Sequence, residues 1–158
     1  MSEILPLNLN DKLPAAPDTK IIGQRGEDLA AGYLIRRKFR LICSNFKTPI
    51  GRNARNATVT GEIDLIAFDE DILCFIEVKT RSSADFASPL AAIDLRKQRQ
   101  IIRTAKIYRK IFNISDIRYR YDAVTVILEK NKRPNIEIFK NFWTESKFKK
   151  KFWKDEIW

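Results

Sequence analysis

The sequence predicts an α/β domain organised around a buried β-hairpin. Two runs rich in β-branched and aromatic residues, 62–68 and 72–79, flank an acidic turn, which is the pattern of a hairpin. Apolar residues recur at helical spacing in two stretches, 23–38 and 90–112, on either side of that hairpin. Because the hairpin is apolar on both faces, we expect it to be central and covered. A chain of 158 residues is long enough for one such domain.

The segment before the hairpin is expected to form a helix, a strand and a loop. The helix 23–38 ends in a basic turn, which suits a helix C-terminus. Residues 39–47 are typical of a strand, and residues 48–61 are rich in Gly, Asn and Thr. The loop 48–61 is long and cationic, so it is either a substrate-facing loop or a tolerated surface insertion.

The segment after the hairpin predicts a second helix and two more strands. A Ser-rich loop, 80–89, leads to the helix 90–112, which has an apolar stripe for the core and a cationic outer face. The basic residues of that outer face are Arg96, Arg99, Arg103, Lys106, Arg109 and Lys110. Strands are expected at 118–129 and 135–140, and Asp122 is expected to form a structural salt bridge.

Both ends of the chain differ from this domain in composition. Residues 1–20 contain three prolines and little periodicity, so they are expected to form a flexible N-terminal arm before a domain at 21–140. Residues 141–158 form a C-terminal tail in which lysines alternate with aromatic residues. Such a tail either stacks on unpaired bases or packs against the core or a second subunit.

Composition excludes several classes of function. The chain contains no histidine, which rules out Ser-His-Asp and Cys-His catalysis and imidazole-bound metals. Cys43 and Cys74 lie in apolar runs and are expected to be reduced core residues. The N-terminus has no basic leader segment, and no apolar run approaches the ~18 residues of a membrane span. We therefore expect a cytoplasmic protein without a membrane partner.

The formal charge of +10 is distributed in blocks. Residues 56–89 contain seven acidic and two basic residues, whereas 20–55 and 90–120 each contain nine basic and two acidic residues. Cationic surfaces attract polyanions, and nucleic acid is the expected partner. The alternative is an ordinary solvated basic surface.

The hairpin carries the residues most suited to chemistry. If its turn has an even number of residues centred between Glu70 and Asp71, then Asp64 faces Glu77 and Glu62 faces Lys79. The four charged side chains then share one face, continued by Ile66, Phe68, Leu73 and Phe75. The opposite face carries Ile63, Leu65, Ile76 and Val78. Two carboxylates ~5 Å apart repel by ~3 kcal/mol at an effective dielectric near 20, so a positive charge is needed.

Two arrangements meet that need. A hard divalent cation, Mg²⁺ or Mn²⁺, bound by Asp64 and Glu77 would allow phosphodiester hydrolysis assisted by Lys79. Alternatively, Glu62 and Lys79 form a buried ion-pair network and Asp64 bonds to a backbone amide, without any catalysis.

The motifs around the hairpin resemble a known family. The segments GQRGEDLA (23–30), GEIDLIA (61–67) and FIEVKTRS (75–82), followed by Tyr121-Asp122, resemble the YraN-like predicted endonucleases of the PD-(D/E)XK superfamily, which are distantly related to archaeal Holliday junction resolvases. The resemblance covers about residues 21–128. It implies a restriction-endonuclease-like fold, with a mixed central sheet flanked by helices.

The resemblance also implies roles for individual residues. Asp64 and Glu77 would hold Mg²⁺, Lys79 would be catalytic, and Glu27 would join the acidic site. From the residues alone, Glu27 equally suits the first turn of a helix, where an acid stabilises the dipole. Lys97 either reaches the site or a phosphate, or extends along the surface as an amphipathic side chain.

Three functions follow from these patterns. The leading one is a Mg²⁺-dependent endonuclease acting on DNA, including branched or structured DNA, with nucleic-acid contacts from Arg52, Arg55, Arg81 and Lys97. The second is a nucleic-acid-binding module without cleavage, and the third is a structural protein with an ion-pair network. Junction-cutting relatives act as dimers, so a homodimer is compatible with the resemblance, but the sequence indicates no dimer face.

Overall fold

The computed structural model describes residues 18–83 and 88–149. The predicted N-terminal arm therefore lies largely outside the described residues, as do the second half of the C-terminal tail, 150–158, and the middle of the Ser-rich loop. The first half of the tail is described and forms the end of β5 and a short 3-10 helix. Neither described helix is both long and apolar enough to cross a membrane.

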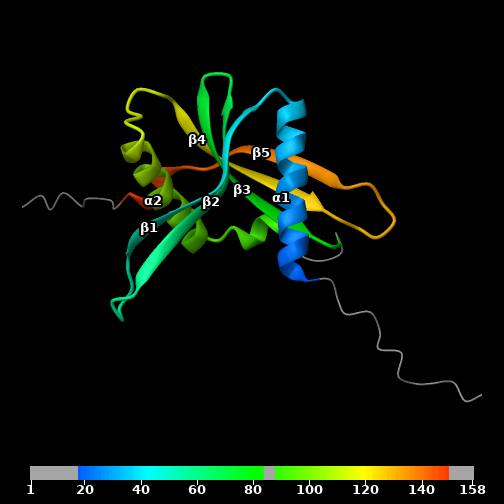
Figure 1. Cartoon of the computed structure of the whole chain (residues 1–158), viewed down its shortest axis with the longest axis horizontal. Coiled ribbons are helices and arrows are strands. Elements are labelled where there is room, and N and C mark those ends of the chain that lie inside the picture. The colour runs from blue at the N-terminus through cyan, green and yellow to red at the C-terminus, as the bar shows by residue number, and fades with distance from the viewer. Residues whose placement is uncertain (1–17, 84–87, 150–158) are drawn as a thin grey trace, which may run out of the picture.

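The described chain forms one mixed five-stranded sheet with a helix on each side (Figure 1). The strands lie in sequence order, with β3 and β4 parallel and all other neighbours antiparallel. The helices are α1 (Thr19–Arg36) and α2 (Leu95–Ile111), and two short 3-10 helices are η1 (Pro89–Ala92) and η2 (Glu145–Phe148). The strands are β1 (Arg40–Arg52), β2 (Thr58–Asp69), β3 (Ile72–Arg81), β4 (Tyr119–Ile127) and β5 (Asn135–Trp143).

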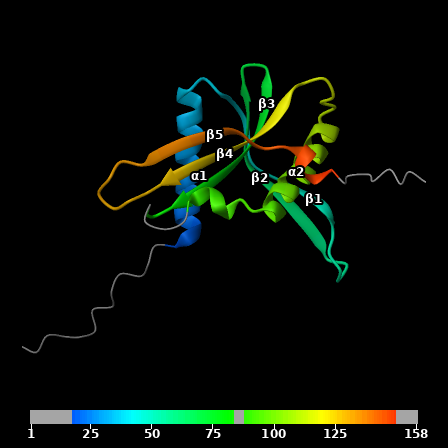
Figure 2. The same cartoon turned by 180° about the vertical axis from the view of Figure 1, so that it is seen from behind.

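Each face of the sheet is buried by one helix, as Figures 1 and 2 show from opposite sides. Ala30 and Leu34 of α1 belong to a cluster with Ile76. Ile101 of α2 belongs to a separate cluster with Phe75 on the other face. Burial on both faces explains why β2 and β3 are nearly continuous apolar runs, and it confirms the α/β class predicted from the sequence.

Two glycines allow the helices to lie this close to the sheet. A Cβ atom at Gly26 of α1 would stand 1.8 Å from Oγ1 of Thr80, and 2.8 Å from Cβ of the same residue. A Cβ atom at Gly61 of β2 would stand 2.0 Å from Oγ1 of Thr104 on α2. These positions therefore fix where α1 meets β3 and where α2 meets β2.

We expect Gly26→Ala to destabilise the protein by about 2 kcal/mol, because the added methyl group overlaps Thr80 where the backbone holds it. Gly23→Ala in the same helix is the matched control, since nothing lies within 4 Å of its Cβ position. That control should stabilise the protein by about 0.5–1 kcal/mol through helix propensity. Urea denaturation of both variants measures the difference, and equal effects would contradict the proposed close contact.

The predicted loop 48–61 is wrong, because β1 and β2 continue through most of it as an extended hairpin. Pairing runs on to Arg52 opposite Thr58, with a register shift at Gly51, where φ is 147°. The turn is closed by the side chain of Asn53, whose Oδ1 accepts hydrogen bonds from the backbone N–H groups of residues 55 and 57 at 3.0 Å. Polar and Gly residues here mark a hairpin with a bulge rather than an unstructured loop.

The predicted second helix, 90–112, is also divided differently. Its first part is the 3-10 helix η1, and α2 begins only at Leu95 because the Asp94 side chain caps it, accepting from the N–H of Lys97 at 2.8 Å. Similarly, α1 begins at Thr19, earlier than expected, after the cap residue Asp18. At the other end, β5 continues past the expected residue 140 to the buried Trp143.

Candidate active site

The predicted hairpin register is confirmed. The paired residues run from Asp69 opposite Ile72 to Leu65 opposite Ile76, around a two-residue turn of Glu70 and Asp71. Beyond Leu65 the contact between β2 and β3 is made by a side chain instead of the backbone. Oδ2 of Asp64 accepts a hydrogen bond from the N–H of Val78 at 2.7 Å. From there β3 continues parallel to β4 as far as Arg81. The Asp64 carboxylate thus lies where β2 and β3 separate.

Glu77 is the most deeply buried charged group of this region, with 1% of its side chain exposed. Its Oε1 accepts a hydrogen bond from Nζ of Lys79, two residues along β3, at 2.6 Å. Its Oε2 lies 3.3 Å from Nζ of Lys97 on α2. This second contact is close enough for an ion pair but is not aligned as a hydrogen bond. One buried carboxylate therefore receives two lysines, from different elements.

Two details of the predicted hairpin face are wrong. Ile63 packs in the α2 cluster with Ile66 rather than on the opposite face, so alternation is broken between them. The break coincides with Asn45 on β1, which has φ 52° between the paired positions 44 and 46. In addition, Glu62 pairs with Lys47 at 3.3 Å and not with Lys79. The alternative Glu62–Lys79 network is thus absent, whereas its expected bond from Asp64 to a backbone amide is present.

The environment of Asp64 disfavours its charge. Burial and the neighbouring Glu77 raise the pKa of Asp64 to about 8. The hydrogen bond from Val78 and the positive charge of Lys97 act in the opposite direction, without compensating fully. A carboxyl group with this pKa is largely neutral at pH 7 and ionises readily when a positive charge is placed beside it.

Glu27 joins the same cluster from α1. Burial raises the pKa of Glu27, and a hydrogen bond from the Asn45 side chain lowers it. The nearby carboxylates raise it further, in the order Glu62, Asp28 and Glu77. The Oε2 of Glu27 is buried and makes no hydrogen bond within the described part of the chain. Asn45 was missed by the sequence analysis. The available signal was an Asn inside a predicted strand, since Asn tolerates the left-handed conformation better than most residues.

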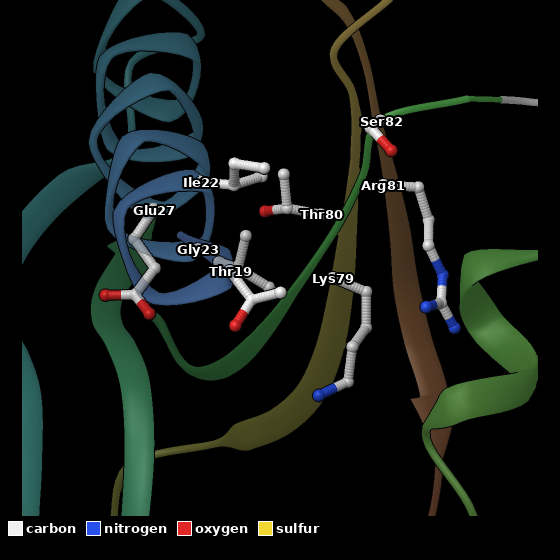
Figure 3. Close-up of a pocket in the computed structure, with 9 residues that line it drawn as sticks. Thr19, Ile22, Gly23, Glu27, Lys79, Thr80, Arg81 and Ser82 are labelled. Atoms are coloured by element: carbon white, nitrogen blue, oxygen red, sulfur yellow. The ribbon is translucent and has the colours of Figure 1, made fainter. Parts of the chain in front are cut away.

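A cavity of about 370 Å³ opens beside these groups, between α1 and the end of β3 (Figure 3). Figure 3 shows Glu27 and Lys79 extending toward the same end of it from α1 and β3. Arg81 also lines the cavity and is exposed. The complete lining is Thr19, Ile22, Gly23, Glu27, Val78, Lys79, Thr80, Arg81 and Ser82.

The structure separates the four predicted nucleic-acid contacts into two pairs. Lys97 and Arg81 lie at the carboxylate cluster and its cavity. Arg52 and Arg55 lie at the turn of the β1–β2 hairpin, which projects from the body of the protein in Figure 1, and neither lines the cavity. Arg52 donates to the carbonyl oxygen of Asn56 at 2.9 Å, so one of its N–H groups supports the turn.

The donor set suits a hard cation. Carboxylate oxygens are the ligands that Mg²⁺ and Mn²⁺ prefer, and buried oxygens of Glu27 and Glu77 lack hydrogen bonds. Among residues 18–83 and 88–149, no three acidic or thiol side chains are already arranged as a metal cage. Mg²⁺ commonly binds through only one or two carboxylates together with water and phosphate oxygens. The residues present therefore fit such a site with Asp64 and Glu77 as the protein ligands.

A mixed sheet covered by one helix on each face, with carboxylates where two central strands separate, defines an α/β protein with a restriction-endonuclease-like arrangement. The chain belongs to the uncharacterised protein family UPF0102, whose model matches residues 26–126. This confirms the membership indicated by the YraN-like motifs.

Several UPF0102 proteins are similar over most of their length. The protein of Prosthecochloris aestuarii is 36% identical over 78% of this chain and 94% of its own. That of Geobacter sulfurreducens is 37% identical over 77% of this chain and 88% of its own. That of Chlorobium limicola is 34% identical over 87% of this chain and 96% of its own.

Proposed function

We propose that the protein is a cytoplasmic, Mg²⁺- or Mn²⁺-dependent endonuclease that hydrolyses phosphodiester bonds of DNA. The observation that carries this proposal is the proximity of two buried carboxyl groups. Glu77 is flanked by Lys79 and Lys97, and together with burial it raises the pKa of Asp64 to about 8. Branched DNA is the first substrate to test, because the motifs resemble those of junction resolvases.

The electrostatics support a catalytic rather than a purely structural role. A network that serves only stability would satisfy its buried oxygens, since an unpaired buried polar group costs ~1–3 kcal/mol. Here Glu27 keeps a buried oxygen without a hydrogen bond, and Asp64 is destabilised in its charged form. The Oε2 of Glu77 meets Lys97 only in an ion pair that is not aligned as a hydrogen bond. Perturbed titrating groups beside a cavity are characteristic of functional sites.

The chain's own residues have distinct tasks in this proposal. Asp64 and Glu77 would hold the cation, which supplies Lewis-acid activation of the phosphate and of a water molecule. Lys79, with 26% of its side chain exposed beside the cavity, either orients the attacking water or stabilises the negative charge that develops on the phosphate. Lys97 offsets the charge of Glu77 from α2, and Glu27 adds a carboxylate from the other side of the cavity.

A second candidate is a nucleic-acid-binding module of the same fold without cleavage. It is favoured because both carboxylates already accept hydrogen bonds from the protein. Lys79 donates to Glu77, and the N–H of Val78 donates to Asp64. In that case DNA binding would survive substitution of these side chains, and DNA would remain intact with Mg²⁺.

A cleavage assay separates the two candidates. We expect supercoiled, linear or four-way-junction DNA to be cut with Mg²⁺ and to remain intact with EDTA. Lys79→Met should slow cutting by ~10²–10³-fold, the loss typical of one electrostatic stabiliser. Lys47→Met is the control, because Lys47 is an exposed lysine of β1 that pairs only with Glu62 among the described residues. Equal cutting by the wild type and Lys79→Met would overturn the assignment of the site.

A further inference from the structure

Helix α2 carries a concentration of positive charge of which the proposed site uses only Lys97. Its 17 residues include seven lysines and arginines and no carboxylate. Five of them follow one another at intervals of three and four residues and therefore form a straight stripe along one helix face. We call these five residues the α2 stripe: Arg96, Arg99, Arg103, Lys106 and Lys110.

The α2 stripe is solvent-exposed along its whole length. Within residues 18–83 and 88–149, Lys106 pairs with Glu145 at 3.4 Å and Arg99 lies over the ring of Phe148 at 5.2 Å. The other three members form no ion pair with a described residue. Like charges three and four residues apart destabilise a helix, so the α2 stripe lowers the stability of α2.

The stripe connects two features of the surface. At its start, Arg96 precedes Lys97, whose Nζ lies 3.3 Å from Glu77 in the candidate active site. At its end, Lys106 and Lys110 line an open cleft of about 470 Å³ together with Arg109. The guanidinium carbon of Arg109 lies 3.9 Å from the ring centroid of Tyr119, so this third cation is held against the protein body.

We infer that the α2 stripe binds the sugar–phosphate backbone of duplex DNA that extends from the active site toward the cleft at Arg109. The inference rests on the proposed function for the position of the cleaved phosphate. From Arg96 to Lys110 the helix rises about 20 Å, which corresponds to about six base pairs of a duplex at 3.4 Å each. The contacts would be to phosphates, so they would add affinity without sequence preference.

Other polyanions fit the stripe less well. An amphipathic helix enters a membrane surface through its apolar face, but the apolar face of α2 is buried in the core by residues such as Ile101 and Ala105. Single-stranded nucleic acid is usually held by aromatic side chains that stack on bases, whereas the one aromatic residue of α2, Tyr108, is buried in the core.

The test measures DNA binding separately from cleavage. All proteins carry Glu77→Gln, and binding of a fluorescent 20-base-pair duplex is followed by anisotropy in EDTA at several salt concentrations. Arg96→Gln/Arg103→Gln/Lys110→Gln should lower the slope of log K against log salt by about 2 to 3, since each phosphate contact contributes about 0.9. Its melting temperature should be equal or higher, because repulsion within the helix is relieved.

The matched control is Arg36→Gln/Arg37→Gln/Lys38→Gln, which removes the same charge at exposed positions at the end of α1. This end lies about 14 Å along α1 from Glu27 and about 25 Å from Thr19, the nearest and the farthest α1 residues that line the cavity. In addition, α1 covers the face of the sheet opposite to α2. An unchanged slope in the control supports the inference, and an equal loss in both variants overturns it in favour of bulk charge.

Two further outcomes would also overturn the inference. One is tighter binding of a single strand of the same length than of the duplex. The other is loss of binding to phosphatidylserine vesicles by the stripe variant with DNA binding intact. The outcome in which the proposed function alone fails is distinct. In that case the wild type cuts no DNA, but the stripe variant still shows the smaller slope of log K against log salt.

Discussion

Replacement of Glu77 by Gln is expected to lower Mg²⁺-dependent DNA cleavage by at least ~10³-fold, because it removes a carboxylate placed to hold the cation and to orient Lys79. The protein should nevertheless remain folded. Lys79 and Lys97 are 26% and 25% exposed, so water can solvate both when their partner is neutral. The substitution also removes the repulsion between Glu77 and Asp64. We therefore expect the free energy of unfolding to change by no more than about 1–2 kcal/mol.

The control for this substitution is Glu62→Gln. Glu62 lies two residues before Asp64 on β2, but it is 35% exposed and pairs with Lys47 outside the cluster. Its loss should change the cleavage rate less than ~3-fold. Plasmid relaxation gives the rates, and calorimetric Mg²⁺ titration gives the metal affinity. Retention of a tenth or more of the wild-type rate by Glu77→Gln would falsify the assignment of Glu77 as a metal ligand.

The stability of the metal-free protein should depend on the protonation of Asp64. Its pKa is about 8 in the folded protein, whereas the ordinary value is 3.8. The folded state thus binds this proton more tightly than the unfolded chain does. The resulting stabilisation is complete below about pH 4 and is lost progressively as the pH rises to 8. At pH 7 and above, Asp64 should cost about 4–6 kcal/mol relative to pH 4.

Asp64→Asn isolates this effect from other groups, such as Asp69, whose pKa is lowered and whose contribution has the opposite pH dependence. The Asn oxygen can still accept the hydrogen bond from Val78. In EDTA, the variant and the wild type should be about equally stable near pH 4. At pH 8 the variant should be more stable by about 4–6 kcal/mol in urea denaturation. Mg²⁺ should stabilise the wild type more at pH 8 than at pH 5 and should not stabilise the variant.

A second buried aspartate provides a control of opposite sign. Asp122 is fully buried, but Arg120 and the N–H of Asn141 donate to it at 2.9 and 2.8 Å. Asp122→Asn should therefore destabilise the protein by about 3 kcal/mol at pH 8, because Arg120 loses a buried partner. If Asp64→Asn were destabilising at pH 8 as well, the raised pKa of Asp64 would be wrong.

The sequence was sufficient to predict the central part of the site. A two-residue turn and strict alternation determine the register of a hairpin, so the approach of Asp64 to Glu77 followed from local rules. Asp122 was likewise confirmed as a salt-bridge residue. The predicted face of Ile63 was wrong because the alternation of side chains is interrupted there. The interruption coincides with the left-handed conformation of Asn45 on the neighbouring strand β1, which the sequence of β2 does not reveal.

Contacts between distant segments could not be predicted in the same way. The contact of Lys97 with Glu77 depends on how closely α2 approaches the sheet, which Gly61 determines. The hydrogen bond from Asn45 to Glu27 joins β1 to α1 across the fold. The length of the β1–β2 hairpin was underestimated because Gly and Asn signal turns more strongly than they signal bulges.

If the protein cleaves DNA as proposed, the two close helix contacts at Gly26 and Gly61 determine when the chain becomes active. Glu27 and Lys97 reach the carboxylates only after α1 and α2 have docked on opposite faces of the sheet. A nascent or misfolded chain carries the same basic segments and would still adhere to DNA through charge alone. It would lack the assembled charge cluster, so under the proposed function it would bind DNA without cutting it, and cleavage would require completed folding.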